Sequence, residues 1–289
     1  MVKDKISGLV GIIGYPLGHS LSPPMHNAAF KHLGLDFHYV PFPIKPEDLA
    51  DGLEGLKSLN MVGCNVTIPY KEHIIPFLDQ LDVEAKMLGA VNTIVNRDGM
   101  LWGYNTDSSG FLRSLVEDLG FNIAGKKALI LGAGGAARAV AFALAKAGIE
   151  GMVIANRSFG KGQKLAEDVQ GYYPCRVQAC LLEPQTLKER LSSAQLLVNT
   201  LPLGMYPHVE GMPPIQPEWL EPSLTVCDLI YNPSKTKLLA MAEKRGCTIL
   251  NGEGMLVYQG AEAFKLWTGQ EAPVSIMRNI LKQELERQD

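Results

Sequence analysis

The sequence lacks the features of a membrane protein, a disulfide-bonded scaffold or a nucleic-acid-binding protein. Its five cysteines are odd in number and form no Cys-x-x-Cys pair, which indicates reduced cytosolic thiols. The longest apolar stretch, residues 128–148, is interrupted by glycines and by Arg138 and Lys146, so it does not predict a membrane span. The net charge is −3 without a long basic run, which argues against nucleic acid as a partner.

Targeting and metal-binding patterns are also missing. The first apolar run, residues 8–15, is short and rich in glycine, unlike the core of a signal peptide. No cluster of His, Cys and carboxylate residues has metal-ligand spacing, and we expect no metal. With 46% hydrophobic residues over 289 positions, the chain is predicted to be a cytoplasmic protein of two domains.

Helical and extended patterns alternate along the first third of the chain. We expect strands at 9–13, 37–42 and 63–68, helices at 22–33 and 46–59, and a hairpin over 90–104 that turns at residues 96–99. This alternation predicts an α/β fold with a mostly parallel sheet and helices on both faces. A further helix is expected from Asp107 to about Leu119.

A second α/β unit is predicted to follow, with strands at 127–131, 152–155, 196–199, 225–230 and 247–250. The segment from Met255 onward reads as helical, and one apolar face carries Leu256, Gln259, Gly260, Ala263 and Trp267. We expect that face to return to the first domain. The predicted domains are therefore 1–107 with 258–289, and 108–257.

Lys71 is the first candidate for chemistry. A buried strand is predicted to end at polar Asn65 and Thr67 and to run into a helix at Pro69. Lys71 would then lie in the first helical turn, where the helix dipole disfavours a cation. Ligand sites of α/β proteins lie at such strand ends. Local stability does not explain Lys71, so we consider it a candidate acid–base residue.

A glycine-rich turn indicates a dinucleotide site. Gly132-x-Gly134-x-x-Ala137 follows a predicted strand and opens a helix, the context in which glycines admit a pyrophosphate to a helix N-terminus. The alternative is an ordinary tight strand–helix connection. The candidate contacts in this turn are Gly132, Ala133, Gly134, Gly135 and Ala136.

The end of the next strand favours NADP over NAD. An NAD enzyme usually carries an acidic residue there, whereas this chain has Asn156, Arg157 and Ser158, with Lys161 nearby. Arg157 is suited to a bidentate pair with a 2′-phosphate, unless it is merely a solvated loop charge. Further cofactor candidates, at or just after the carboxyl ends of later strands, are Thr200, Met205, Leu229, Gly252 and Met255.

Several polar residues have a structural explanation beside a functional one. Ser22 would make a helix N-cap before Pro23, and Asp107 would cap a helix beginning at Ser108. Ser20, next to His19, has no such explanation. Gln259 falls on an apolar helix face, where a buried amide needs partners from the protein or from a ligand.

In combination, these motifs resemble the shikimate dehydrogenase family over essentially the whole chain. The matching segments are residues 14–23, 65–71, 89–93, 103–107, 132–136, 156–158 and 252–259. The resemblance implies two α/β domains with a cleft between them, the second of Rossmann type. It also implies reversible, NADPH-dependent reduction of 3-dehydroshikimate to shikimate, a step toward the aromatic amino acids.

The resemblance also assigns roles to individual residues. It implies that Lys71 and Asp107 are the catalytic pair and that Ser20 and Ser22 bind the substrate carboxylate. It further implies that the carboxylate or the ring hydroxyls are held by Asn65, Thr67, Asn92, Tyr231 and Gln259. One departure concerns the cofactor, because Ser158 and Lys161 stand where NADP-specific members often have Thr and a second Arg. Lysine forms no bidentate fork, so NADP selectivity is expected to be weaker.

Three alternatives stay open from the sequence. A quinate/shikimate dehydrogenase would accept both substrates or both cofactors. A catalytically inactive sensor would bind the same ligands, although Lys71 and Asp107 are intact and no DNA-binding segment is added. A methylene-tetrahydrofolate dehydrogenase would share the architecture but not the Asn92 and Asn105-Thr106-Asp107 arrangement. The oligomeric state is also open, a homodimer being one option.

Overall fold

The computed structural model describes residues 7–18 and 20–287, and His19 lies outside this range. Two compact units are present. Unit 1 contains the described residues up to Gly110 and from Val257 on, and unit 2 contains Phe111–Leu256. The C-terminal segment therefore belongs to the first unit. None of the helices that the structure describes combines the length and apolar character needed to cross a bilayer.

Unit 1 is built on a six-stranded mixed sheet with the order β2-β1-β3-β5-β6-β4. β1 (Ser7–Gly14) pairs in parallel with β2 (Asp36–Pro43) and β3 (Gly63–Val66). β5 (Thr93–Arg97) and β6 (Met100–Tyr104) form the expected hairpin, and β4 (Gln80–Leu81) lies parallel to β6 at the edge. The sheet is less parallel than predicted because the hairpin adds antiparallel pairs β3–β5 and β5–β6.

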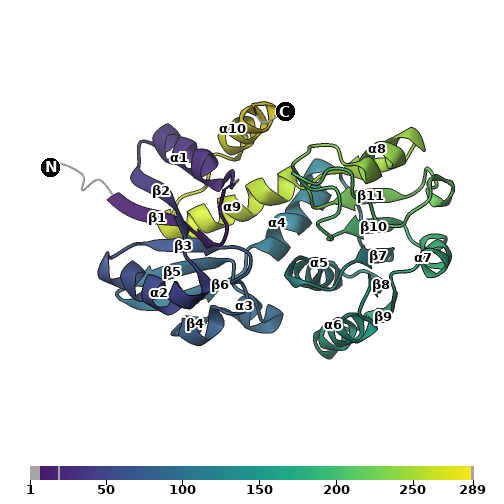
Figure 1. Ribbon diagram of the computed structural model, residues 1–289, viewed down its shortest axis with the longest axis horizontal. Helices are drawn as coiled ribbons and strands as arrows, with labels where there is room; N and C mark the ends of the chain where they lie inside the picture. Colours follow the sequence, from purple (N-terminus) through teal and green to yellow (C-terminus); the bar gives the residue numbers. More distant parts are fainter. Residues whose placement is uncertain (1–6, 19, 288–289) are drawn as a thin grey trace. The chain divides into compact units, whose positions relative to one another are not determined.

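Helices cover both faces of this sheet (Figure 1). One face carries α1 (Ser22–Leu33), most of α9 (Glu253–Thr268) and α10 (Val274–Glu286). The other carries α2 (Leu49–Ser58), which follows the 3-10 turn Pro46–Asp48, and α3 (Val83–Leu88). The apolar face predicted for the C-terminal helix is largely buried, and Trp267 Nε1 donates to the Ile94 carbonyl at 3.0 Å. This contact fixes α9 to the central sheet of unit 1.

Unit 2 is a fully parallel, doubly wound sheet with the order β12-β11-β10-β7-β8-β9. Its strands are β7 (Lys127–Leu131), β8 (Gly151–Asn156), β9 (Arg176–Leu181), β10 (Leu196–Asn199), β11 (Thr225–Asp228) and β12 (Thr248–Leu250). Read outward from β7 this is the strand order of Rossmann domains, in which ligands bind where the order reverses. That position lies between β7 and β10.

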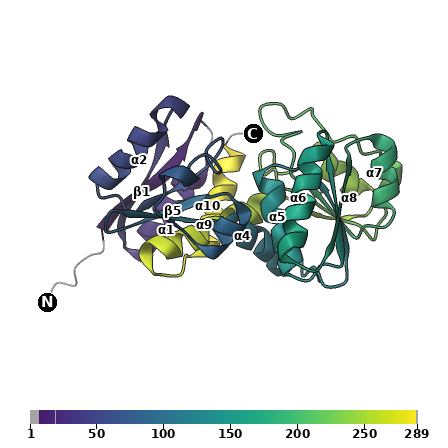
Figure 2. The same ribbon diagram turned by 90° about the horizontal axis from the view of Figure 1, so that it is seen from below.

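The helices of unit 2 are α5 (Gly135–Lys146), α6 (Phe159–Tyr172), α7 (Pro184–Leu191) and α8 (Lys237–Lys244). α5 and α6 cover one face of the sheet, and α7 and α8 the other (Figures 1 and 2). The elements α6, β9, α7 and α8 were not predicted from the sequence. α7 shows why: it is polar apart from two buried leucines and has little apolar periodicity.

The prediction of a helix starting at Pro69 is wrong. β3 ends at Val66, and residues 67–74 form turns before a short 3-10 helix, Ile75–Phe77. The Lys71 carbonyl accepts a hydrogen bond from the Val91 N–H at 2.7 Å, and Pro76 has no N–H for a helical bond to Glu72. Lys71 is therefore in a turn, and the helix-dipole argument for it does not apply. The helix expected at 107–119 is present as α4 (Asp107–Arg113) followed by a π-helical turn, Ser114–Asp118.

The core of unit 1 contains an unusual histidine. His26 on α1 is fully buried, stacks on the Tyr39 ring at 4.6 Å, and lies 5.4 Å from the Trp267 ring. Among the described residues, neither ring nitrogen has a hydrogen-bond partner. Burial without a partner disfavours the charged imidazolium and lowers the pKa of His26 to about 3.

We expect His26 to make the protein less stable in mild acid. The unfolded chain binds a proton at this side chain below about pH 6.5, whereas the folded protein does not until about pH 3. The free energy of unfolding should therefore fall by about 1.4 kcal/mol for each pH unit across this window. Urea unfolding of the wild type and of His26→Leu between pH 7 and 4.5 measures the difference in slope.

A suitable control is His32→Gln, because His32 is exposed on the same helix. This variant should keep the wild-type slope. Equal slopes for His26→Leu and the wild type would contradict the assignment of the acid sensitivity to His26.

Candidate active site

Lys71 and Asp107 form a close ion pair in unit 1. Lys71 Nζ donates to Asp107 Oδ2 at 2.6 Å. The Asp107 side chain is 8% exposed and that of Lys71 is 26% exposed, so the carboxylate is buried while the lysine side chain is partly accessible. The lysine is thus held by a fixed, buried counter-ion.

Asp107 is not a helix cap. α4 begins at Asp107 itself, and the Asp107 N–H donates to the Asn105 side chain at 3.0 Å. The two carboxylate oxygens instead accept from Lys71 and from Asn92 Nδ2, the latter at 2.9 Å. The capping explanation of Asp107 is thus wrong, and its side chain is available for the site.

The capping explanation of Ser22 is also wrong. α1 begins at Ser22, its N-cap is Leu21, and no side-chain cap is formed. Ser22 is 6% exposed, and its N–H donates weakly to the hydroxyl of half-buried Ser20 at 3.4 Å. The Ser22 hydroxyl therefore does not cap α1, whereas the Ser20 hydroxyl accepts from the first N–H of the helix.

Asn92 lies at the centre of a network of buried amides and hydroxyls. Its Nδ2 donates to Asp107, to Thr106 Oγ1 at 2.9 Å and to Gln259 Oε1 at 3.3 Å. Its Oδ1 accepts from the Thr106 N–H at 2.8 Å and from Thr93 Oγ1 at 3.0 Å. The network places Gln259, which comes from α9, beside residues of the β5–β6 region.

Asn65 extends the network along the sheet. Its Nδ2 donates to Thr93 Oγ1 at 3.0 Å and to the Asn92 carbonyl at 3.2 Å, and its Oδ1 accepts from the Tyr39 hydroxyl at 2.8 Å. The structure thus brings five predicted residues of unit 1 into one connected set: Asn65, Lys71, Asn92, Asp107 and Gln259. Thr67 follows β3 and is half-buried, whereas Tyr231 belongs to unit 2.

Three members of the network were missed from the sequence. Tyr39 and Thr93 lie in strands where they read as ordinary sheet residues, and Thr106 was assigned no role of its own. The hydroxyl of a buried Tyr or Thr gives no periodic signal, because both residue types favour strands on packing grounds.

The glycine-rich turn of unit 2 has the geometry of a phosphate-binding turn. Gly132, directly after β7, has φ of +112°, and a Cβ there would lie 2.5 Å from Thr200 Oγ1. Thr200 follows β10 and donates to the Leu131 carbonyl at 2.7 Å. By contrast, a Cβ on Gly134 or Gly135 would meet no atom within 4 Å. Open space therefore lies in front of the N-terminus of α5.

The predicted 2′-phosphate residues surround the end of β8. Asn156 is its last residue, and its side chain donates to the Ser158 carbonyl at 3.0 Å. Arg157 and Ser158 follow, and Lys161 lies in the first turn of α6; all three are exposed. Within the described part of the chain, neither Arg157 nor Lys161 makes an ion pair, so both cations are available to an anion.

Buried Asp228 holds the two loops after β10 and β11. It accepts from Thr236 Oγ1 at 2.7 Å and from Asn199 Nδ2 at 3.0 Å. Burial raises the pKa of Asp228, and these hydrogen bonds act in the opposite direction.

Leu229 donates through its N–H to the Asn199 carbonyl, and a Cβ on Gly252 would lie 2.0 Å from the Leu229 carbonyl oxygen. Met205 is exposed, and Met255 lies in the first turn of α9.

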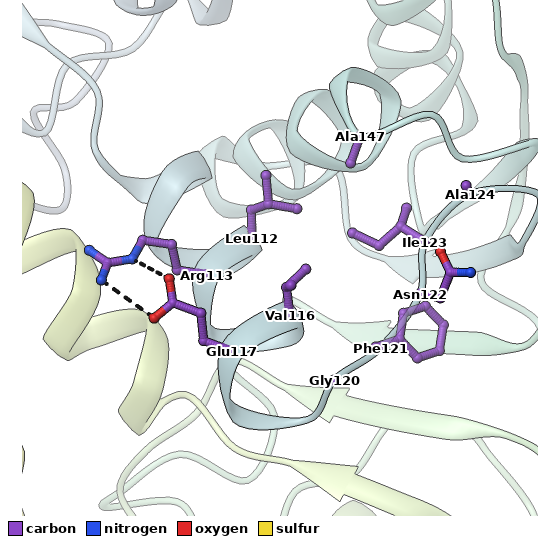
Figure 3. Close-up of a pocket in the computed structure, with 10 residues that line it drawn as sticks. All are labelled: Leu112, Arg113, Val116, Glu117, Gly120, Phe121, Asn122, Ile123, Ala124 and Ala147. Carbon is purple, nitrogen blue, oxygen red and sulfur yellow. Dashed lines mark hydrogen bonds and ion pairs between the residues drawn. The ribbon is translucent and has the colours of Figure 1, made fainter.

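A separate apolar pocket in unit 2 does not coincide with these residues. It is lined by Leu112, Arg113, Val116, Glu117, Gly120, Phe121, Asn122, Ile123, Ala124 and Ala147 (Figure 3). Its charged residues, Arg113 and Glu117, pair with each other at 2.9 Å. No residue predicted to bind substrate or cofactor lines it.

We expect Gly132→Ala to destabilise unit 2. The substitution imposes a positive φ on an L-residue and pushes a methyl group against Thr200, which should lower the free energy of unfolding by about 1–3 kcal/mol. Thermal and urea unfolding measure this loss. Gly135→Ala is the matched control. Gly135 is the first residue of α5, and a Cβ there meets no atom within 4 Å, so the free energy of unfolding should stay within about 0.5 kcal/mol of the wild type. Equal stabilities of the two variants would contradict the strain at Gly132.

Comparisons with known proteins agree with this geometry. Models described as the shikimate dehydrogenase substrate-binding domain, shikimate/quinate 5-dehydrogenase and the shikimate 5′-dehydrogenase C-terminal domain match residues 12–94, 114–200 and 252–282. The shikimate dehydrogenase (NADP(+)) of Moorella thermoacetica is 52% identical and aligns with 99% of this chain and 96% of its own length. The chain belongs to the shikimate dehydrogenase family. The family and the two-domain α/β fold predicted from the sequence are thereby confirmed.

Solved structures include both branches of the family that the sequence left open. Shikimate 5-dehydrogenase of Thermus thermophilus, in complex with NADP(H) and shikimate, has a TM-score of 0.85 at 36% identity, covering 96% of this chain and 99% of its own. Quinate dehydrogenase of Corynebacterium glutamicum, in complex with NAD, has a TM-score of 0.89 at 33% identity with the same coverage. The fold is therefore shared by enzymes that differ in substrate and cofactor.

Proposed function

We propose that the protein is an NADP-dependent oxidoreductase that reversibly reduces 3-dehydroshikimate to shikimate. The observation that carries this proposal is the Lys71–Asp107 pair at 2.6 Å, held by the buried Asn92 network in a chain of this family. Residues 1–107 with 258–289 would bind the substrate, and residues 108–257 the cofactor. Five buried free cysteines support a cytoplasmic location.

Lys71 is proposed to move the proton of the reaction. NADPH, when bound, supplies the hydride that reduces the keto carbon. As charge develops on the carbonyl oxygen, the Lys71 ammonium donates a hydrogen bond and then a proton to it. In the reverse direction the neutral amine accepts the hydroxyl proton. Asp107 orients the ammonium and stabilises its charge, and Asn92 keeps the carboxylate in place.

The proposed substrate carries a carboxylate and several ring hydroxyls, and the residues proposed to bind it can hydrogen-bond to these groups. Ser20 and Ser22 supply hydroxyl donors for the carboxylate. Amide and hydroxyl groups of Asn65, Thr67, Asn92 and Gln259 suit the ring hydroxyls, and we assign Tyr231 of unit 2 to the same substrate. Neutral hydrogen-bonding groups discriminate hydroxyls well, because a wrong substrate leaves buried polar groups unpaired.

The cofactor residues fit a dinucleotide with a 2′-phosphate. Gly132, Ala133, Gly134, Gly135 and Ala136 would hold the pyrophosphate at the free N–H groups of α5, where the structure leaves room. Arg157 and Lys161, with Asn156 and Ser158, would hold the 2′-phosphate. Thr200, Met205, Leu229, Gly252 and Met255 would contact the rest of the cofactor.

A dual-specificity enzyme is the second candidate. Lys161 offers a point charge where a second arginine would offer a fork, which favours weaker discrimination between NADP and NAD. The similarity to a quinate dehydrogenase solved with NAD keeps quinate in consideration as a substrate. A sensor without activity is less well supported, since Lys71 and Asp107 are paired as a proton-transfer site requires.

The deciding experiment measures initial rates with shikimate and quinate, each with NADP⁺ and with NAD⁺. We expect fast turnover only with shikimate and NADP⁺. Comparable rates with quinate or NAD⁺ would favour the dual enzyme. Binding without turnover in all four pairs would favour the sensor.

Arg157→Ser should raise the KM for NADP⁺ about tenfold or more while leaving that for NAD⁺ unchanged, because a charge-assisted pair with the phosphate is lost.

We expect Lys71→Met to lower kcat by a factor of about 10²–10⁴, because it removes the acid–base group. NADPH binding, measured by fluorescence titration, should be unchanged. The matched control is Lys57→Met. Lys57 is a paired lysine of unit 1 with 27% of its side chain exposed, lying close to Glu54 and Asp79. The control should keep wild-type turnover, and near-wild-type turnover in Lys71→Met would overturn the assignment.

A further inference from the structure

Tyr39 is a buried residue that no role in the reaction yet explains. It lies on the edge strand β2 and is 2% exposed. Its N–H donates to Asn27 Oδ1 at 2.8 Å, and its carbonyl accepts from Asn27 Nδ2 at 2.9 Å. The side chain of Asn27 thus pairs both backbone groups that an edge strand would otherwise leave free. The backbone position of Tyr39 is fixed by α1.

The ring of Tyr39 is held as firmly as its backbone. It stacks on His26 with an interplanar angle of 6° and lies 6.0 Å from the Trp267 ring. From this position its hydroxyl donates to Asn65 Oδ1 at 2.8 Å. The phenol therefore holds the amide oxygen of a residue proposed to bind substrate.

The phenol has one proton to give, and the contacts fix where it goes. Burial, the neighbouring Cys64 and the Ser22 contact act on Tyr39, and the net effect raises its pKa well above the usual value, so the hydroxyl remains a donor. Among the described residues, Tyr39 is the one donor to Asn65 Oδ1. Its carbonyl end therefore faces Tyr39 and its amino end faces Thr93 and Asn92.

The same direction continues through the next groups. Thr93 Oγ1 accepts from Asn65 and gives its proton to Asn92 Oδ1 at 3.0 Å. The amino end of Asn92 is then directed at Asp107. If the Asn65 amide were rotated, its oxygen would take the place of Nδ2, which lies 3.2 Å from the Asn92 carbonyl oxygen. Two acceptors would then face each other without a proton between them. The Tyr39 hydroxyl and the Asn92 carbonyl thus favour the same orientation of the Asn65 amide, and Thr93 connects that amide to Asn92.

We propose that Tyr39 is a positioning residue for the substrate site: its hydroxyl helps to fix the orientation of the Asn65 amide, and through Thr93 that of Asn92. The inference rests on the proposed function for its consequence, which is correct presentation of hydrogen-bonding groups to the substrate ring and carboxylate. His26 contributes by holding the Tyr39 ring, a packing role that needs no hydrogen bond and fits the lack of any partner for its nitrogens among the described residues.

The test compares Tyr39→Phe with Tyr70→Phe. Both substitutions remove the hydroxyl of a buried tyrosine in unit 1 and keep the ring, but the Tyr70 hydroxyl donates to the Ile44 carbonyl at 2.6 Å and makes no hydrogen bond to the network among the described residues. We expect Tyr39→Phe to raise the KM for shikimate about tenfold or more, with a smaller fall in kcat and an unchanged KM for NADP⁺. Tyr70→Phe should leave all three near wild type.

A second measurement does not depend on activity. In protein labelled with ¹⁵N-asparagine, Tyr39→Phe should speed hydrogen exchange at the Asn65 side-chain amide at least about tenfold, because the amide loses the hydrogen bond at its oxygen and opens more readily. Tyr70→Phe should not change it. Unchanged exchange, or kinetics equal to those of Tyr70→Phe, would overturn the inference. Absence of shikimate turnover in the wild type, with the exchange effect present, would instead refute the proposed function and leave the positioning by Tyr39 intact.

Discussion

The buried carboxylate of Asp107 is the constraint on which the substrate unit depends. A buried charge is tolerated only when it is paired and hydrogen-bonded, and both oxygens of Asp107 are occupied, one by Lys71 and one by Asn92. Removing either partner would leave part of that charge uncompensated. The positions of the Lys71 ammonium and of the Asn92 amide are therefore set by the same requirement.

The three residues 91–93 connect that requirement to the sheet. The Val91 N–H donates to the Lys71 carbonyl at 2.7 Å, and the Asn92 carbonyl accepts from the Val66 N–H at 2.8 Å. Thr93 pairs in register with Asn65 on one side and with Tyr104 on the other. One short segment thus ties the turn of Lys71, the end of β3 and the hairpin together, so the site is built on rigid elements rather than on a free loop.

The two units differ in how far their sites were predictable from the sequence. The glycine-rich turn is local: strand, Gly132 and helix follow one another, and the backbone conformation of Gly132 requires the residue seen there. The amide network joins residues far apart in the chain, such as Asn92 and Gln259 at a separation of 167 positions. Periodicity predicted that Gln259 is buried but not its partner. The helix at Lys71 was mispredicted because the tertiary bond from Val91 takes its carbonyl.

The failed capping explanations carry a more general argument. Ser, Asp and Asn at predicted helix starts have a sufficient structural role, and from the sequence Ser22 and Asp107 satisfied it. In the structure Asn105 accepts from the Asp107 N–H, and the N-cap of α1 is Leu21 rather than Ser22. A helix start that forgoes an available cap gives up about 1 kcal/mol of stabilisation. The side chain of Asp107 instead joins the Lys71 and Asn92 hydrogen bonds, in the position that the proposed proton transfer uses.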